Sequence, residues 1–278
     1  KNIESFVDLS AIVPGVTVSK NEGYKTVISI RGVGNETNQN AIAAPSVAFH
    51  IDGVFIASPF SLLTDFIDID RIEVLRGPQG TLFGQNSTGG AINVISKKST
   101  TDDYYGKADV TLGNYDLLKY RSSVNIPINE KVATRFSFSS TERDGFSENI
   151  VNGQDLDDAN NLSLRSDWVI ETSETSSLRI FAQYFDIDRN GAAMRGIDDQ
   201  TAGIRHLAQD TLSNQELTSK VFAAIYEQDL GYANLKILAS SQEDDISVTR
   251  DNDRHNLGET VAAIPGLEGT TYIKAEFR

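Results

Sequence analysis

The feature that most constrains the fold is an alternation of apolar and polar residues that recurs through the second half of the chain. In residues 118–126, for example, Leu, Tyr, Val and Ile occupy one face, and Lys, Arg, Ser and Asn occupy the other. A period of two is typical of a β-strand that has one apolar face. Similar runs lie at 105–113, 132–140, 162–170 and, more weakly, 178–186, 217–227 and 232–241, and we expect an eighth strand to begin at 271–278.

The length and spacing of these runs indicate a membrane-spanning barrel. Each run has about nine to eleven residues, as a tilted strand that crosses a bilayer requires, whereas strands of soluble sheets usually have about five to six. Short connections alternate with long polar ones, which is typical of outer-membrane barrels. The turn at 113–116 is an exception, because it is short but falls on the long-loop side. A soluble all-β sheet would alternate too, and this alternative stays open.

Composition excludes several other classes of protein. No apolar run approaches the roughly 18 residues of a membrane-spanning helix. The formal net charge of −14 argues against nucleic acid as a partner, because phosphate binding needs clustered Lys and Arg. The absence of Cys excludes thiolate catalysis and Cys-ligated zinc. The charge is distributed unevenly along the chain. Residues 1–100 include eight basic and nine acidic residues, whereas residues 101–278 include 17 basic and 30 acidic residues.

Residues 1–100 are predicted to form a small mixed α/β domain. An apolar helical face at 3–12 ends at Pro14-Gly15, and a tight hairpin turn is predicted at Asp52-Gly53. The segment 77–90 holds five Gly in fourteen residues, which indicates backbone positions that need positive φ or close packing. Short strands are predicted at 26–31, 46–51, 71–76 and 91–96.

The stretch RIEVLRGPQGTLFGQNSTGGAINVISKK at 71–98 resembles the plug domain of TonB-dependent outer-membrane receptors. The resemblance extends upstream, in the same order and spacing, through VDLSAIVPGVTVS at 7–19, SIRGVG at 29–34 and VAFHIDGVFI at 47–56. It implies a membrane β-barrel with an N-terminal mixed α/β plug domain at 1–100 and the first part of the barrel at 101–278.

The strand count implies that the chain is a fragment of such a receptor. Plugged barrels have about 22 strands, whereas we count only seven or eight here. A closed barrel of about eight strands has no room for a domain of about 100 residues. We therefore expect an N-terminally truncated plug, without the TonB-contacting segment, and a barrel truncated at its C-terminal side.

The function implied by the resemblance is active uptake of a scarce ligand, most often a ferric siderophore, across the bacterial outer membrane. The implied partners are the TonB complex of the inner membrane, the small-molecule ligand, and outer-membrane lipid with lipopolysaccharide. Enzymatic activity and a cofactor are not expected. Receptors of the same fold for glycans, cobalamin or haem are the alternative, and a soluble β-rich glycan-binding or hydrolytic protein is the alternative from another class.

The resemblance also assigns candidate site residues. Arg31 and Arg76 match plug arginines that pair with barrel carboxylates and hold the plug in place. Arg suits this role because it makes bidentate, charge-assisted bonds and stays charged when partly buried. Glu73 is a further candidate for plug–barrel pairing, and a solvated face is its alternative. Ligand contacts are expected at the plug apex, at Asn35, Glu36, Asn38, Gln39 and Asn40.

Other motifs do not support a further site. The glycine-rich segment lacks the Lys-Ser/Thr of a phosphate loop, because Gly90-Ala91 stands there. The sequence from Asp186 to Gly191 opens like a calcium loop, but Ile197 stands where the loop needs Glu. His50 is predicted to be a packed histidine, and no metal site is predicted.

Overall fold

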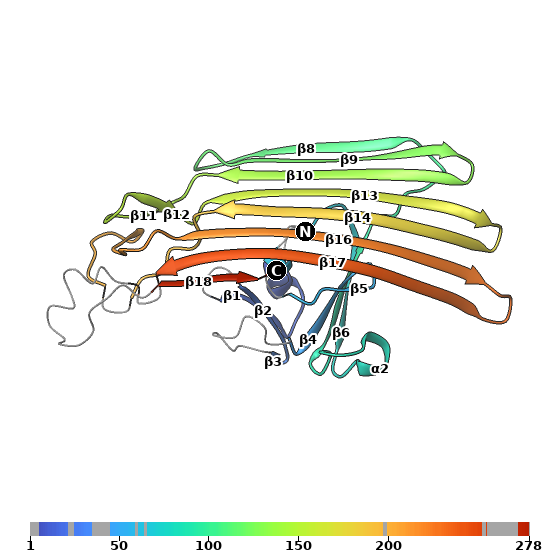
Figure 1. Cartoon of the computed structure of the whole chain (residues 1–278), viewed down its shortest axis with the longest axis horizontal. Coiled ribbons are helices and arrows are strands. Elements are labelled where there is room, and N and C mark those ends of the chain that lie inside the picture. Colours follow the sequence, from blue (N-terminus) through green and yellow to red (C-terminus); the bar gives the residue numbers. More distant parts are fainter. Residues whose placement is uncertain are drawn as a thin grey trace.

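The computed structural model describes residues 6–21, 25–34, 45–58, 61–63, 66–196, 199–251, 254 and 272–277. They form a small N-terminal domain and one large antiparallel sheet (Figure 1). No helix among these residues is long and apolar enough to span a membrane.

The large sheet is a meander in which each strand pairs with its neighbours in sequence. Its order is β18-β17-β16-β14-β13-β10-β9-β8, so β8 and β18 are its two edges. The seven predicted strands and the beginning of an eighth are therefore confirmed. The strands are Tyr105–Leu112 (β8), Leu118–Asn129 (β9), Val132–Arg143 (β10), Ala159–Ser173 (β13), Ser176–Arg189 (β14), Asn214–Asp229 (β16), Asn234–Asp251 (β17) and Tyr272–Phe277 (β18).

Several strands are longer than the alternation predicts. β17 has 18 residues and ends at Asp251, ten residues beyond the predicted end. Residues 242–245 are Gln-Glu-Asp-Asp, which is polar on both faces, yet the ladder with β16 continues through them. Where both faces of a sheet meet water, the hydrogen-bonded ladder persists without alternation. The apolar pattern therefore marks only the part of each strand that needs an apolar face.

The strand ends differ on the two sides of the sheet. Short turns connect β9 to β10, β13 to β14 and β16 to β17 at one end. The long connections lie at the other end (Figure 1), where three short strands form a separate small sheet. These are Ser147–Asn149 (β11), Gln154–Leu156 (β12) and His206–Leu207 (β15). This is the predicted arrangement of turns and loops.

The N-terminal domain contains two small sheets and short helices. All four predicted strands are present, and the structure adds two further strands, at 16–21 and 33–34, and two short helices, at 61–63 and 80–83. The four-stranded sheet has the order β5-β4-β7-β6, with Val47–Ile51 (β4), Val54–Phe55 (β5), Ile69–Arg76 (β6) and Gly90–Ser96 (β7). The three-stranded sheet comprises Val16–Asn21 (β1), Lys25–Ile30 (β2) and Val33–Gly34 (β3). The helices are Phe6–Asp8 (η1), Leu9–Ile12 (α1), Ser61–Leu63 (η2) and Gly80–Phe83 (α2).

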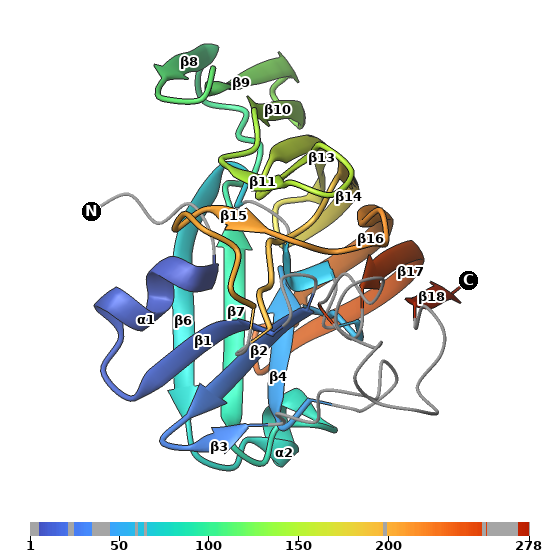
Figure 2. The same cartoon turned by 90° about the vertical axis from the view of Figure 1, so that its left-hand side faces the viewer.

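The N-terminal domain packs against the inner, concave side of the large sheet (Figure 2). One apolar cluster joins the two parts: Phe6, Phe49 and Ile92 of the domain belong to it together with Phe181 and Ile225 of the sheet. Because strand residues alternate between faces, each long strand presents one face to this domain and the other away from it. The large sheet therefore has an inner face, toward the domain, and an outer face.

The glycine-rich segment contains one position that only glycine can occupy. Gly90 has φ +144°, and a Cβ there would overlap the carbonyl oxygen of Leu75 and lie 2.8 Å from Cδ1 of Ile30. We expect Gly90→Ala to destabilise the N-terminal domain by at least about 1–3 kcal/mol. The measurement is the urea concentration at which this domain becomes protease-sensitive in the full-length protein.

Gly80→Ala is the matched control, because a Cβ at Gly80 would meet no atom within 4 Å. Alanine is favoured over glycine in a helix, so the control should be neutral or slightly stabilising. Equal protease sensitivity of the two variants would contradict the steric account.

Candidate functional site

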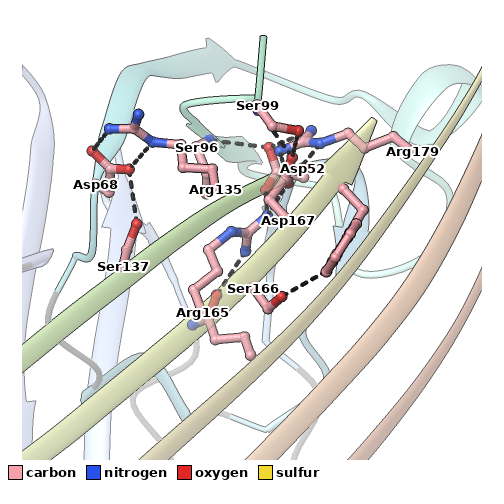
Figure 3. A network of polar contacts seen from close by, with 12 residues as sticks. Asp52, Asp68, Ser96, Ser99, Arg135, Ser137, Arg165, Ser166, Asp167 and Arg179 are labelled. Atoms are coloured by element: carbon pink, nitrogen blue, oxygen red, sulfur yellow. Dashed lines mark hydrogen bonds and ion pairs between the residues drawn. The ribbon is translucent and has the colours of Figure 1, made fainter. Parts of the chain in front are cut away.

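Four charged side chains are buried together where the N-terminal domain meets the large sheet (Figure 3). We call them the Asp52 cluster: Asp52, Arg165, Asp167 and Arg179. Asp52 accepts bonds from both arginines, at 2.6 Å from Nη2 of Arg165 and 3.2 Å from Nη1 of Arg179. Its side chain is fully buried, and the other three side chains are at most 7% exposed. The cluster is the main polar connection between the two parts.

The turn between β4 and β5 places Asp52 in this position. Asp52 and Gly53 have φ values of +52° and +87°, as expected of a two-residue hairpin turn, and the predicted turn at these residues is confirmed. Asp tolerates the left-handed region better than most residues. The turn projects the carboxylate toward the inner face of β13 and β14.

Strand periodicity and register place the other three side chains of the Asp52 cluster on the inner face. Arg165 and Asp167 are two residues apart on β13 and therefore share the inner face. Arg179 on β14 pairs with Val169, which places it diagonal to Asp167. Nη2 of Arg179 lies 2.7 Å from a carboxylate oxygen of Asp167, and Nη2 of Arg165 lies 3.5 Å from the same oxygen. Two cations thus lie between two anions, and the cluster is neutral overall.

Burial makes the cluster costly to disturb. Removing one partner of a buried ion pair leaves an uncompensated charge and costs about 3–5 kcal/mol. The Arg165 guanidinium also lies 4.1 Å from the centroid of the Phe181 ring, so it has an aromatic contact besides its carboxylates. The cluster therefore fixes the position of the domain rather than adding large net stability.

The Asp68 contact is a second polar connection. Asp68, just before β6, receives bonds from Arg135 of β10, with Nη2 at 3.0 Å, and from Oγ of Ser137 at 2.9 Å. Burial acts to raise the pKa of Asp68, but the hydrogen bond and charge of Arg135, with help from Ser137 and Lys107, outweigh burial and hold this pKa below its usual value. The carboxylate is therefore charged at neutral and mildly acidic pH.

The connection between the domain and the large sheet is also fixed. Asn125, which is fully buried, donates to the carbonyls of Thr100 at 2.9 Å and Asp103 at 2.7 Å, and accepts from the Thr100 amide at 3.0 Å. The amide of Ser99 donates to Asp167 at 3.1 Å. Residues 99–103 are therefore held against the inner face of β9 and β13.

The long connections are tied to one another at the opposite end from the short turns. The Arg205 guanidinium lies 5.4 Å from the ring centroid of Tyr115 and 5.0 Å from that of Phe146. Arg143 lies 4.9 Å from the centroid of the same Phe146 ring. Nδ2 of the fully buried Asn149 donates to the carbonyl of Gln209 at 2.9 Å. The short turn between β8 and β9 and two long connections, from β10 to β13 and from β14 to β16, thus form one packed assembly.

The residues predicted from sequence lie elsewhere. Arg31 and Arg76 are exposed, and the described residues give neither a carboxylate partner. Glu73 pairs with Arg71 at 2.8 Å and accepts from Nδ2 of Asn93 at 3.4 Å, so its contacts lie within the N-terminal domain. The pairing of these three residues with the barrel stays a prediction. The predicted apex residues Asn35, Glu36, Asn38, Gln39 and Asn40 lie outside the described residues.

The sequence gives only a weak indication that the residues of the Asp52 cluster form a site. Arg165 and Asp167 stand out as charges on the polar face of a strand, and Asp52 stands out only as part of a turn. In the sequence, 113 residues separate Asp52 from Arg165. In the observed pairs, the carboxylates of Asp52 and Asp68 come from the domain and their arginine partners come from the large sheet.

His50 is packed within the N-terminal domain, as predicted. Its ring centroid lies 5.5 Å from that of Phe55 and 5.1 Å from that of Phe83, and the residue is 5% exposed. Burial lowers the pKa of His50 to about 4. In the part of the chain that the structure describes, no three His, Asp or Glu side chains are grouped as metal ligands would be.

Comparisons with known proteins agree with this arrangement. A family profile described as the TonB-dependent Receptor Plug Domain matches residues 1–91. The pesticin receptor of Yersinia pestis is 31% identical over 121 residues, which are 42% of this chain and 17% of that receptor. The vitamin B12 transporter of Vibrio vulnificus is 28% identical over 154 residues, which are 54% of this chain and 24% of the transporter.

Solved structures share the fold. The ferric yersiniabactin uptake receptor of Yersinia pestis superposes with a TM-score of 0.74 at 18% identity, covering 87% of this chain and 38% of the receptor. The outer-membrane ferripyoverdine receptor of Pseudomonas aeruginosa, bound to ferripyoverdine, gives 0.73 at 19% identity, covering 91% and 34%. The chain therefore spans at most about a quarter of these curated relatives and less than two fifths of these structures.

Removing one charge of the Asp52 cluster should loosen the N-terminal domain. Asp52→Asn keeps a residue that tolerates the turn but leaves two buried arginines with one carboxylate. We expect a loss of about 3–5 kcal/mol, measured as a lower urea midpoint for protease sensitivity of the domain in the full-length protein. Asp70→Asn is the control, because Asp70 pairs with Arg71 at the surface with 51% of its side chain exposed. Equal midpoints for the two variants would contradict a fixing role for the cluster.

The low pKa of His50 predicts a loss of stability in acid. The unfolded chain binds a proton at His50 below pH 6.5, whereas the folded domain does so only near pH 4. Stability should therefore fall as the pH drops through this window, by up to about 3 kcal/mol. His50→Phe should flatten the pH dependence of the urea midpoint, whereas His206→Phe, on an exposed residue, should not. An unchanged pH dependence in His50→Phe would be the contrary result.

Proposed function

Because this chain belongs to the TonB-dependent receptors of the bacterial outer membrane, we propose that the intact protein takes up a scarce small molecule across that membrane. The N-terminal domain is then the plug, and the large sheet is the first part of the barrel wall. The energy would come from the TonB complex of the inner membrane. Uptake of this kind needs no covalent chemistry.

The observation that carries the proposal is the plug held on the inner face of the wall by buried ion pairs. A ligand that passes through the lumen requires the plug to shift relative to β13 and β14. Separating the Asp52 cluster exposes charges that water can solvate, so a shifted plug is accessible, but the step costs several kcal/mol. An external energy source is consistent with that cost.

The relatives favour an iron complex as ligand. Two of the similar proteins are named for ferric yersiniabactin and ferripyoverdine. We therefore propose a ferric siderophore as the ligand class. The similarity to a vitamin B12 transporter supports cobalamin as the second candidate. Haem and glycans are further alternatives within the family.

The sequence-based site residues complete the proposal. Asn35, Glu36, Asn38, Gln39 and Asn40 would contact the ligand from the plug apex. Arg31, Arg76 and Glu73 would pair with groups of the barrel wall that this chain does not include. The Asp52 cluster and the Asp68 contact would hold the plug on the wall strands β10, β13 and β14.

An uptake assay tests the function. Cells that express the full-length receptor should accumulate radiolabelled iron from one member of a ferric siderophore panel, and accumulation should be lost without the receptor or without TonB. Cobalamin, haem and oligosaccharides are tested in the same assay as the alternative ligands. Accumulation that is unchanged by loss of TonB would contradict the mechanism, and uptake of cobalamin alone would replace the proposed ligand class.

A further inference from the structure

The plug meets the wall in two different ways. Along β14 and β16 the contact is apolar, because Phe181, Val221 and Ala223 belong to the same buried cluster as residues of the plug. Phe181 and Ala223 are fully buried, so the plug covers the wall completely at these positions. We call this contact the apolar seal.

Along β8 and β9 a cavity of about 440 Å³ separates the plug from the wall. We call it the β6 cavity, because the start of β6 forms its plug side. The Asp68 contact (Figure 3) lies at its border, since Asp68 is one of the lining residues. Three acidic and three basic side chains line the cavity, so its charge is balanced. They are Asp68, Asp70 and Arg71 of the plug, and Lys107, Asp109 and Arg121 of the wall.

A second cavity, of about 310 Å³, lies nearer the short turns. Its lining includes Lys98 of the plug, and Glu171 and Glu227 of the wall, which lie close to the ends of β13 and β16. Outer-membrane barrels place their short turns in the periplasm, so we call this space the periplasmic cavity. Arg71 lines both cavities and therefore lies between them.

Arg71 is a weak barrier between the two cavities. It pairs with Asp70 at 2.9 Å and with Glu73 at 2.8 Å, and the three side chains are 57%, 51% and 42% exposed. Ion pairs this exposed contribute little free energy, so the guanidinium can turn away at small cost. Opening the apolar seal would instead expose apolar surface to water, which is unfavourable in proportion to the area. The plug therefore separates from the wall more readily along the charged flank.

We propose that the ligand passes from the lumen to the periplasm along this charged flank, through the β6 cavity and past Arg71 into the periplasmic cavity. This route rests on the proposed uptake function. Asp52 and Arg179 also line the periplasmic cavity, so separating the Asp52 cluster widens it while the apolar seal stays closed. Walls of balanced charge neither trap nor repel a polar ligand of either sign.

The experiment blocks the β6 cavity with a removable group. Residues 1–278 contain no cysteine, and any cysteine elsewhere in the full-length receptor is changed to serine. Asp70→Cys places a thiol in the lining of the β6 cavity, at a side chain that is 51% exposed. Asp103→Cys is the matched control, because the same substitution is made at an exposed residue that lines neither cavity. A methanethiosulfonate reagent that carries biotin modifies each thiol in cells, and mass spectrometry confirms the modification.

Two quantities are measured with radiolabelled ferric catecholate, hydroxamate and phenolate siderophores and with radiolabelled cobalamin. Binding at the cell surface is measured in cells without TonB, and accumulation is measured in cells with TonB. Modified Asp70→Cys should bind its ligand as the wild type does but lose most of the accumulation, and a reducing agent that removes the biotin should restore it. Modified Asp103→Cys and reagent-treated wild type should accumulate the ligand normally.

Undiminished accumulation by fully modified Asp70→Cys would overturn the proposed route, and so would an equal loss in modified Asp103→Cys. An untreated wild type that accumulates none of these compounds would overturn the proposed function, and the route with it. The two failures are distinguishable, because only the second is seen before any reagent is added.

Discussion

The position of the plug depends on the burial of four charges, two of each sign, between a tight turn and two strands. Asp52 alone belongs to the plug, whereas Arg165, Asp167 and Arg179 belong to the wall. A polar inner wall has to be satisfied by whatever fills the lumen, because buried charges without partners are costly. The hairpin turn at Asp52 meets that requirement, and Ser96 and Ser99 bind to the same carboxylates.

Each wall strand is adapted to two different environments. On β13 the inward residues Arg165 and Asp167 alternate with the outward residues Ser166 and Trp168. Of the inner residues, Arg165 makes an ion pair with Asp52 of the plug and Asp167 pairs with Arg179 of the wall, whereas the outer residues lie on the face away from the plug. A shift of one residue in register would exchange the two sets, so both faces act together to fix the register.

Much of the fold could be predicted from alternation and turn residues. The strands and the Asp52-Gly53 turn followed from local patterns, because those patterns reflect local geometry and the solvent at each face. The extension of β17 through residues 242–245 did not follow, because both of its faces are polar there. The carboxylates of Asp52 and Asp68, which accept these bonds, were missed as site residues, because their partners lie far away in the sequence and no local pattern records such a pair.

The attachment of residues 96–103 restricts how the plug could leave its place. The amide of Ser96 is bound to Asp52, while Ser99 and Thr100 are bound to wall residues Asp167 and Asn125. A displacement that keeps the Ser99–Asp167 and Thr100–Asn125 contacts would rotate the plug about residues 99–100. The other end of the domain, with β1, β2 and β3, would then travel the greatest distance.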